Sequence, residues 1–118
     1  MKLLLDPNGI NYTRVMPLYD VTLPEDEAER IKFAKNVFDE LENGGKQILL
    51  LNHPRKRFRI GVYELNNFVY LIQSVKTESF SKNNLYVADD THLDDFKKIA
   101  KYLEGIYYGS SKNQIQTR

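Results

Sequence analysis

Arginine, tyrosine and lysine side chains recur at alternate positions along two neighbouring segments of the chain. Arg57, Arg59 and Tyr63 fall on the first segment, and Tyr70 and Lys76 fall on the second. Successive side chains of a β-strand point to opposite faces, so positions two or four apart share a face. Guanidinium groups bind carboxylates and phosphates through paired hydrogen bonds, and tyrosine offers rigid contact area with a polar tip. These five residues therefore predict a basic, aromatic binding surface.

The turn between the two segments decides which side chains share that surface. Asn66-Asn67 separates residues 58–65 from residues 68–75, and both asparagines tolerate a positive φ. The pattern predicts an antiparallel hairpin whose second face is apolar and receives the helices of the fold. A slip of one residue would exchange the two faces. The apolar face is expected to carry Phe58, Ile60, Val62, Val69, Leu71 and Val75.

The loop before the first segment adds positive charge beside the predicted surface. It reads His53-Pro54-Arg55-Lys56, so Arg55 joins the predicted binding residues. His53 with Arg55, Arg57, Arg59 and Tyr63 also has the residue types of a ribonuclease that works without a metal, because cations stabilise the developing phosphorane charge. No sequence motif accompanies these residue types, so this reading is an alternative.

Two amphipathic helices are expected on either side of the hairpin in the sequence. Residues 23–43 carry apolar side chains at helical spacing, and Thr22 with Glu25 forms a capping-box pattern at their start. Residues 91–108 carry a second apolar stripe, which Asp90 or Thr91 can cap.

Further strands are expected outside the hairpin. Residues 47–51 form a short apolar run and residues 85–87 a second one, while residues 2–5 and 14–21 are candidates near the start. The fold class predicted is α+β, with a predominantly antiparallel sheet and two amphipathic helices packed on one face. One domain is expected over residues 1–109, followed by a flexible tail over residues 110–118.

Composition limits the classes of protein to which the chain can belong. Its 118 residues carry 17 basic and 16 acidic side chains, a net charge of +1, which disfavours a general coat for duplex DNA. The absence of cysteine excludes thiolate zinc sites and disulfides. The early apolar run is too short for an export segment, and no run approaches the roughly 20 residues of a membrane span. A cytoplasmic location is expected, without contact with a membrane.

Other motifs of catalysis or metal binding are absent from the sequence. His53 and His92 each lack a second ligand at metal-site spacing, and the paired aspartates 89–90 and 94–95 are explained by helix capping. The glycines form no phosphate-cradling loop. No catalytic residue, metal site or cofactor is therefore predicted.

The sequence thus favours a small, non-enzymatic binding or accessory protein, of the inhibitor or immunity type. Its expected partner is another protein with an acidic surface, because tyrosine and arginine are enriched where interfaces gain their affinity. Single-stranded nucleic acid is an alternative partner for the same surface, since bases stack on aromatic rings beside a basic groove. The metal-independent ribonuclease remains the third hypothesis.

Overall fold

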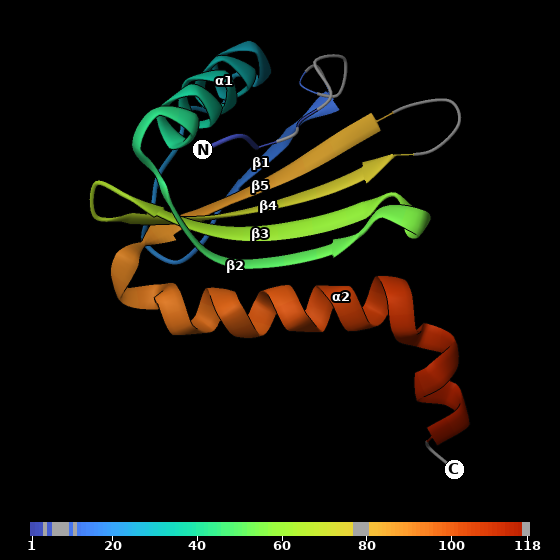
Figure 1. Cartoon of the computed structure of the whole chain (residues 1–118). Helices are drawn as coiled ribbons and strands as arrows, with labels where there is room; N and C mark the ends of the chain where they lie inside the picture. The colour runs from blue at the N-terminus through green and yellow to red at the C-terminus, as the bar shows by residue number, and fades with distance from the viewer. Residues whose placement is uncertain (4, 6–9, 11, 77–80, 117–118) are drawn as a thin grey trace.

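The computed structural model describes residues 1–3, 5, 10, 12–76 and 81–116. One five-stranded sheet, in the strand order β1-β5-β4-β3-β2, lies between two helices (Figure 1). β1 pairs parallel with β5, whereas the other neighbouring strands pair antiparallel, so the predicted α+β class with a mostly antiparallel sheet is confirmed. The elements are β1 (Arg14–Pro17), α1 (Glu27–Gly44), β2 (Lys46–His53), the 3-10 turn η2 (Pro54–Lys56), β3 (Phe58–Leu65), β4 (Phe68–Lys76), β5 (Ser81–Asp89), the 3-10 turn η3 (Asp90–His92) and α2 (Leu93–Gln116).

The central hairpin forms as its sequence predicts. Asn66 and Asn67 have φ values of 51° and 70°, which is the left-handed conformation that a tight two-residue hairpin needs. Tyr63 lies opposite Tyr70, and Arg59 lies opposite Ser74, as the turn position requires. The register of β3 and β4 is therefore confirmed.

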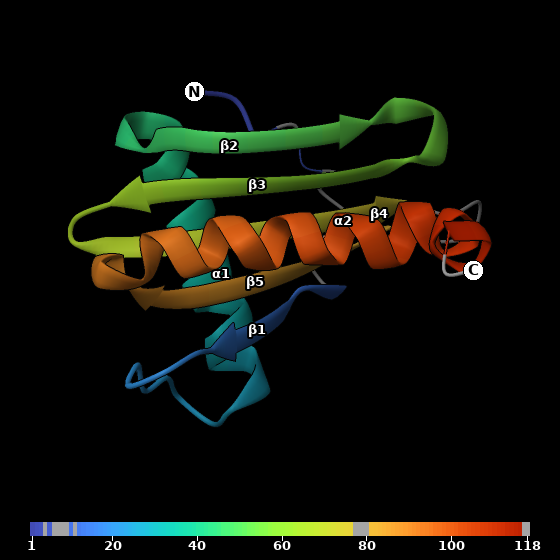
Figure 2. The same ribbon diagram turned by 90° about the horizontal axis from the view of Figure 1, so that it is seen from below.

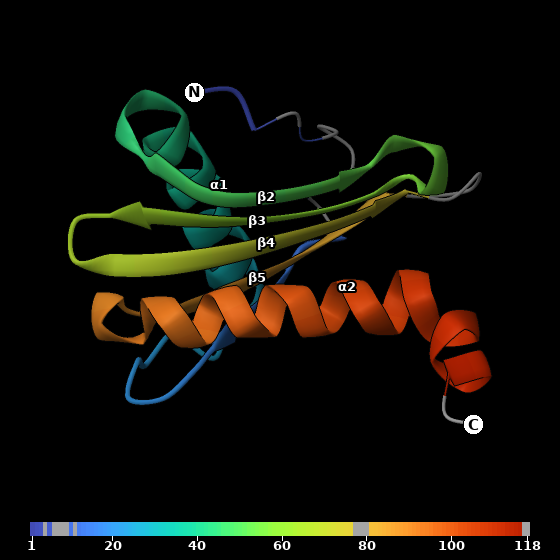
Figure 3. The same cartoon turned by 60° about the horizontal axis from the view of Figure 1, so that its bottom comes forward.

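The prediction that both helices pack on one face of the sheet is wrong. α2 covers the expected apolar face, where Phe96 and Ala100 join Phe58, Ile60 and Val62 in one buried cluster. α1 lies on the opposite face, where its apolar side chains join the two hairpin tyrosines in a second cluster. Figures 1 and 3 show one helix on each side of the sheet. The α1 residues buried there are Ala34, Val37, Phe38 and Leu41.

Burial on both faces has a physical reason in the residues of β3, β4 and β5. Tyr63, Tyr70, Ile72, Leu85 and Val87 share the face under α1, which we call the α1 face, and each is at most 6% exposed. An apolar sheet face is unfavourable in contact with water, so another element must pack on it. Figure 2 shows that α2 runs along the strands on the other side, whereas α1 crosses them.

The helix boundaries differ from those expected. Asp26 caps α1, because its side chain accepts a hydrogen bond from the Glu29 amide at 3.1 Å, so the predicted Thr22 cap is wrong. Asp89 rather than Asp90 or Thr91 provides the cap before η3, accepting from the Thr91 amide at 2.8 Å. α2 continues to Gln116, past the predicted end at Tyr108.

The strand boundaries also differ at the edges of the sheet. β5 spans nine residues where three were expected, and β1 ends at Pro17 instead of reaching Val21. Lys2, Leu3 and Leu5 belong to no strand, and Leu4 lies outside the described residues. No helix in the described part of the chain is long and apolar enough to cross a membrane.

Candidate binding site

A pocket with a basic lining opens on the α1 face, at the end of the sheet away from the Asn66-Asn67 turn. α1 covers the sheet near that turn, whereas η2 lies at the opposite end (Figures 1 and 3). The cavity has a volume of about 250 Å³. We call it the basic pocket; its lining residues are Asn52, Pro54, Arg57, Phe58, Arg59, Ser74, Val75, Lys76, Ser81, Lys82 and Asn83.

Arg57 is positioned by a strained but well-anchored backbone. It ends η2 in the left-handed conformation, with φ 54° and ψ 43°. Its amide donates to the Pro54 carbonyl at 3.1 Å, and its own carbonyl accepts from the Lys76 amide at 3.0 Å. A left-handed arginine costs roughly 1–2 kcal/mol, which these two hydrogen bonds offset. Both sides of the Arg57 backbone are thereby fixed at the rim of the basic pocket.

A row of polar residues crosses the sheet at the floor of the basic pocket. Asn52, Arg59, Ser74 and Asn83 lie opposite one another on β2, β3, β4 and β5. Residues directly opposite on neighbouring strands share a face, so these four side chains are neighbours on the α1 face. The row marks the boundary between the apolar area under α1 and the basic end of the sheet.

Hydrogen bonds order the β4–β5 side of this polar row. The Ser74 hydroxyl donates to Oδ1 of Asn83 at 2.8 Å, and Nδ2 of Asn83 donates to the Thr13 hydroxyl at 3.5 Å. Asn83 is only 3% exposed. A buried amide without partners is costly, so this network holds the floor in one arrangement.

The Tyr63 side chain lies on the same face of β3 as Arg59, which lines the pocket. A Cβ atom added at Gly61 would lie within 2.5 Å of the Tyr63 ring edge and hydroxyl, so the ring lies over Gly61 and extends toward Arg59. Burial raises the pKa of Tyr63 above its ordinary value, and the Arg59 charge opposes part of that rise. Glycine at position 61 is what allows the ring to lie this close to the strand.

The charged residues among the described lining of the basic pocket all have the same sign. Arg57, Arg59 and Lys76 are cationic lining residues, and none of the described lining residues is acidic. Lys82 also borders the cavity, but it lies opposite Val75 and so belongs to the face under α2. A concave site lined by one sign of charge raises the local concentration of the opposite ion and accelerates its association. The basic pocket is therefore suited to an anionic group.

The structure brings together three of the six residues predicted to bind. Arg57, Arg59 and Lys76 line the basic pocket, while the exposed Arg55 lies in the adjoining η2 turn. Tyr63 and Tyr70 are only 3% and 6% exposed, so the expectation that their rings are open to a partner is corrected. The physical reason is that α1 packs on these rings.

Sequence reasoning missed the polar residues on the neighbouring strands. Asn52, Lys82 and Asn83 belong to strand ends that carry no apolar alternation, so no local pattern extended β2 or β5 to include them. The hairpin register puts Ser74 on the same face as Arg59, but the role of Ser74 requires its partner Asn83. The signal that could have revealed them is pairing between distant strands.

His53 lies apart from the arginines with which the ribonuclease hypothesis grouped it. It is opposite Phe58 in the sheet, on the face covered by α2. Its Nε2 atom lies 2.5 Å from a carboxylate oxygen of Glu104 on α2. The structure therefore places His53 and the pair Arg57 and Arg59 on opposite sides of the sheet.

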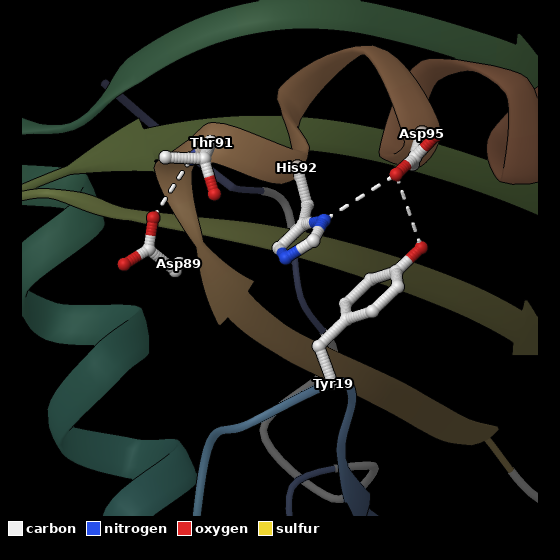
Figure 4. A network of polar contacts seen from close by, with 5 residues as sticks. All are labelled: Tyr19, Asp89, Thr91, His92 and Asp95. Atoms are coloured by element: carbon white, nitrogen blue, oxygen red, sulfur yellow. Dashed lines mark hydrogen bonds and ion pairs between the residues drawn. The ribbon is translucent and has the colours of Figure 1, made fainter.

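A second polar cluster joins the segment after β1 to the start of α2. The Tyr19 ring stacks on His92 with a centroid separation of 3.7 Å, and its hydroxyl donates to Asp95 at 3.3 Å (Figure 4). Nδ1 of His92 lies 3.3 Å from the same carboxylate oxygen. Desolvation and the Asp95 carboxylate raise the pKa of Tyr19. The contacts fasten two elements together at the end of the sheet opposite the basic pocket.

Comparison with protein-family models, with curated proteins and with solved structures finds no match to this chain. Within the described residues, no group of three or more histidine, aspartate or glutamate side chains is arranged to hold a metal ion. The basic pocket is therefore the feature of the described residues on which a functional proposal can rest.

Proposed function

We propose that this chain is a small, non-enzymatic binding protein of the cytoplasm whose partner is another protein, recognised through an acidic segment that enters the basic pocket. An inhibitor or immunity-type role fits such a protein. The observation that supports the proposal is that Arg57, Arg59 and Lys76 line one cavity, whose described lining residues include no acidic one. Electrostatic complementarity of this kind favours fast and selective association with an acidic surface.

The burial of the hairpin tyrosines favours a protein partner over single-stranded nucleic acid. Binding of single strands depends on bases stacking on exposed rings. The two rings expected to do this, Tyr63 and Tyr70, lie under α1. The remaining surface is a compact charged pocket, which suits a short acidic segment better than an extended strand of nucleotides.

A capture experiment with matched variants tests the proposal. The wild-type chain and the Arg57→Gln/Arg59→Gln double variant are immobilised and exposed to a lysate of the native host, and captured proteins are identified by mass spectrometry. Lys98→Gln/Lys101→Gln is the control, because it removes the same charge from α2, on the other face of the sheet. Melting curves establish that all three chains are folded.

The expected result is a protein captured by the wild-type chain and the control but not by the arginine variant. With that protein purified, removing both arginines should slow its association by about tenfold or more at low salt, because steering contributes roughly 10–10³ in rate. Capture and association rates that do not change in the arginine variant would rule out the basic pocket as the contact surface.

A further inference from the structure

We propose that the outer edge of β2 pairs with the same edge of a second copy of this chain, so that the two sheets join into one continuous sheet about a twofold axis. The paired segment is residues 49–53, which run antiparallel to residues 49–53 of the other copy. Two features of β2 support this pairing, namely its poor protection as an edge strand and the direction of its amides. Neither feature depends on the charge of the basic pocket.

The two edge strands of the sheet differ in how well they are protected against pairing with another chain. β1 has only four residues and ends at Pro17, and its Val15 carbonyl accepts a hydrogen bond from the Arg30 guanidinium at 2.8 Å. Short strands, proline and charged side chains are the usual protection of an edge. β2 has eight residues, and its residues 47–52 include no charge and no proline. Figure 2 shows β2 at the outer edge of the sheet, clear of α2.

The hydrogen bonds of the central hairpin define which β2 amides point out of the sheet. The Arg57 carbonyl accepts from the Lys76 amide at 3.0 Å. Bonding alternates along an antiparallel strand, so the odd-numbered residues of β3 bond to β4 and the even-numbered ones bond to β2. The β2 residues opposite Phe58, Ile60 and Val62 are His53, Leu51 and Leu49. Leu50 and Asn52 therefore direct their N–H and C=O groups outward, where no group of the described residues bonds to them.

The side chains of the same segment are apolar on both faces of the sheet. Leu50 is 39% exposed on the α1 face. Leu49 and Leu51 are only partly buried against the cluster under α2. Consecutive apolar residues along an exposed edge are typical of a surface that pairs with another strand. An added strand would remove more of these three side chains from water.

A second β2 matches this edge in hydrogen bonding and in polarity. The bulge between Gln47 and Leu49 leaves residues 49–53 as the regular part of the strand, with Leu51 at their midpoint. With the twofold axis at Leu51, Leu50 of each copy lies opposite Asn52 of the other, and each such pair exchanges both N–H···O bonds. Leu51 then meets its own counterpart, so apolar side chains lie opposite each other at the axis.

The expected dimer is weak and reversible, because one strand pair buries little area. Interfaces below about 1,200 Å² are characteristic of transient complexes. Asn52 also lines the basic pocket. A continuous sheet keeps its two faces, so pairing would place the basic pockets of both copies on the same face of the joined sheet.

Cysteine cross-linking tests the pairing and its register. The chain contains no cysteine, so a single introduced cysteine can form a disulfide only with the same position of another copy. In the proposed register the Cα atoms of residue 51 lie about 4.5 Å apart, which suits a disulfide. Those of residue 50 are offset by two positions and lie more than about 7 Å apart, which does not.

The two variants, Leu51→Cys and Leu50→Cys, are oxidised in the same glutathione buffer and compared on non-reducing gels. We expect Leu51→Cys to give several-fold more disulfide-linked dimer, although Leu50 is the more exposed of the two residues. Equal or greater cross-linking of Leu50→Cys would follow from exposure alone and would overturn this pairing.

Sedimentation of the chain without cysteine provides the second test. Leu50→Pro removes an outward N–H while leaving the bonds to β3 in place, and Leu50→Lys adds a charge to the edge without changing the backbone. Both should associate at least tenfold more weakly than the wild-type chain, with melting curves of dilute samples that stay close to it. Leu50→Lys keeps the test valid if proline disturbs the strand.

The outcomes also separate this inference from the proposed function. Arg57→Gln/Arg59→Gln, which should lose the captured partner, is expected to dimerise as the wild-type chain does. A wild-type chain that is monomeric up to about 1 mM, well above the range of ordinary transient dimers, would overturn the proposal. Association that is unchanged in Leu50→Lys would also overturn it.

Discussion

Replacement of Gly61 by alanine tests how the Tyr63 ring is placed on β3. The added Cβ would lie within 2.5 Å of the Oη, Cζ and Cε2 atoms of Tyr63. Contacts this short force the ring to move, and Tyr63 is only 3% exposed under α1. Gly61→Ala must therefore either displace a buried ring or shift the strand.

Two opposing effects set the size of the change in stability. Overpacking of a core typically costs about 1–3 kcal/mol. Replacing a glycine in a regular element recovers roughly 0.5–1 kcal/mol, because alanine has less conformational freedom to lose. The clash outweighs the gain from the backbone, so we expect a net loss of about 1 kcal/mol in the free energy of unfolding. With slopes of about 1–3 kcal/mol/M, the urea midpoint should fall by roughly 0.3–1 M.

A double-mutant cycle with Tyr63→Leu isolates the cause. Leucine lacks the three atoms that the new Cβ would meet, so in the Tyr63→Leu background Gly61→Ala should be neutral or slightly stabilising. The measurement is urea denaturation of the four chains followed by circular dichroism. A Gly61→Ala chain as stable as wild type, or an equal loss in both backgrounds, would refute the placement of the Tyr63 ring over Gly61.

Three other predictions concern stability. Asn83→Ala should lower the free energy of unfolding by about 1–3 kcal/mol in urea titrations, because it removes a buried amide bonded to Ser74 and Thr13; an unchanged midpoint would mean that the network contributes nothing. Burial raises the pKa of Tyr70, with a smaller contribution from Glu40, so its stabilising effect is complete below the ordinary tyrosine pKa of about 10 and is lost as the pH rises further. Tyr70→Phe should therefore weaken the alkaline fall in melting temperature, and an identical fall in both chains would contradict this. Hydrogen bonds from Thr91 lower the pKa of Asp89, so its stabilising effect is present above the ordinary aspartate pKa and disappears on further acidification. The melting temperatures of wild type and Asp89→Ala should differ at pH 7 and converge at acid pH; a constant difference would exclude a role for the charge.

The sequence predicted the parts of the fold that local rules determine. Asn66 and Asn67 defined the turn because few residues accept two positive φ angles in succession. With the turn defined, alternation placed Arg59 and Ser74 side by side on one face of the hairpin. The same alternation put Arg57 and Lys76 on that face, so four lining residues of the basic pocket were expected to lie together.

What covers each face could not be predicted in the same way. The tyrosine rings of the hairpin are compatible with solvent or with a helix, and the choice depends on α1, which is distant in sequence. The capping of α1 had a similar ambiguity, because Thr22 with Glu25 and Asp26 with Glu29 both fit a capping pattern. Which of the two residues caps α1 depends on where the helix begins in the folded protein, and there the cap is Asp26.

β5 shows why the polar floor escaped prediction. Residues 82–84 are lysine and two asparagines, which are disfavoured in strands when judged alone. Pairing with β4 along nine residues, and with β1 on the other side, overrides that preference. Two of these three residues, Lys82 and Asn83, line the basic pocket.

Entry of an acidic partner into the basic pocket on the α1 face is the proposal on which the functional conclusions depend. The decisive experiment is to add the captured partner, unlabelled, to the isotope-labelled chain and to map the affected amides by NMR. We predict that perturbations centre on Arg57, Arg59, Ser74 and Lys76. Perturbations centred on α2 or on the Asn66-Asn67 turn, with those four amides unchanged, would contradict binding at the basic pocket.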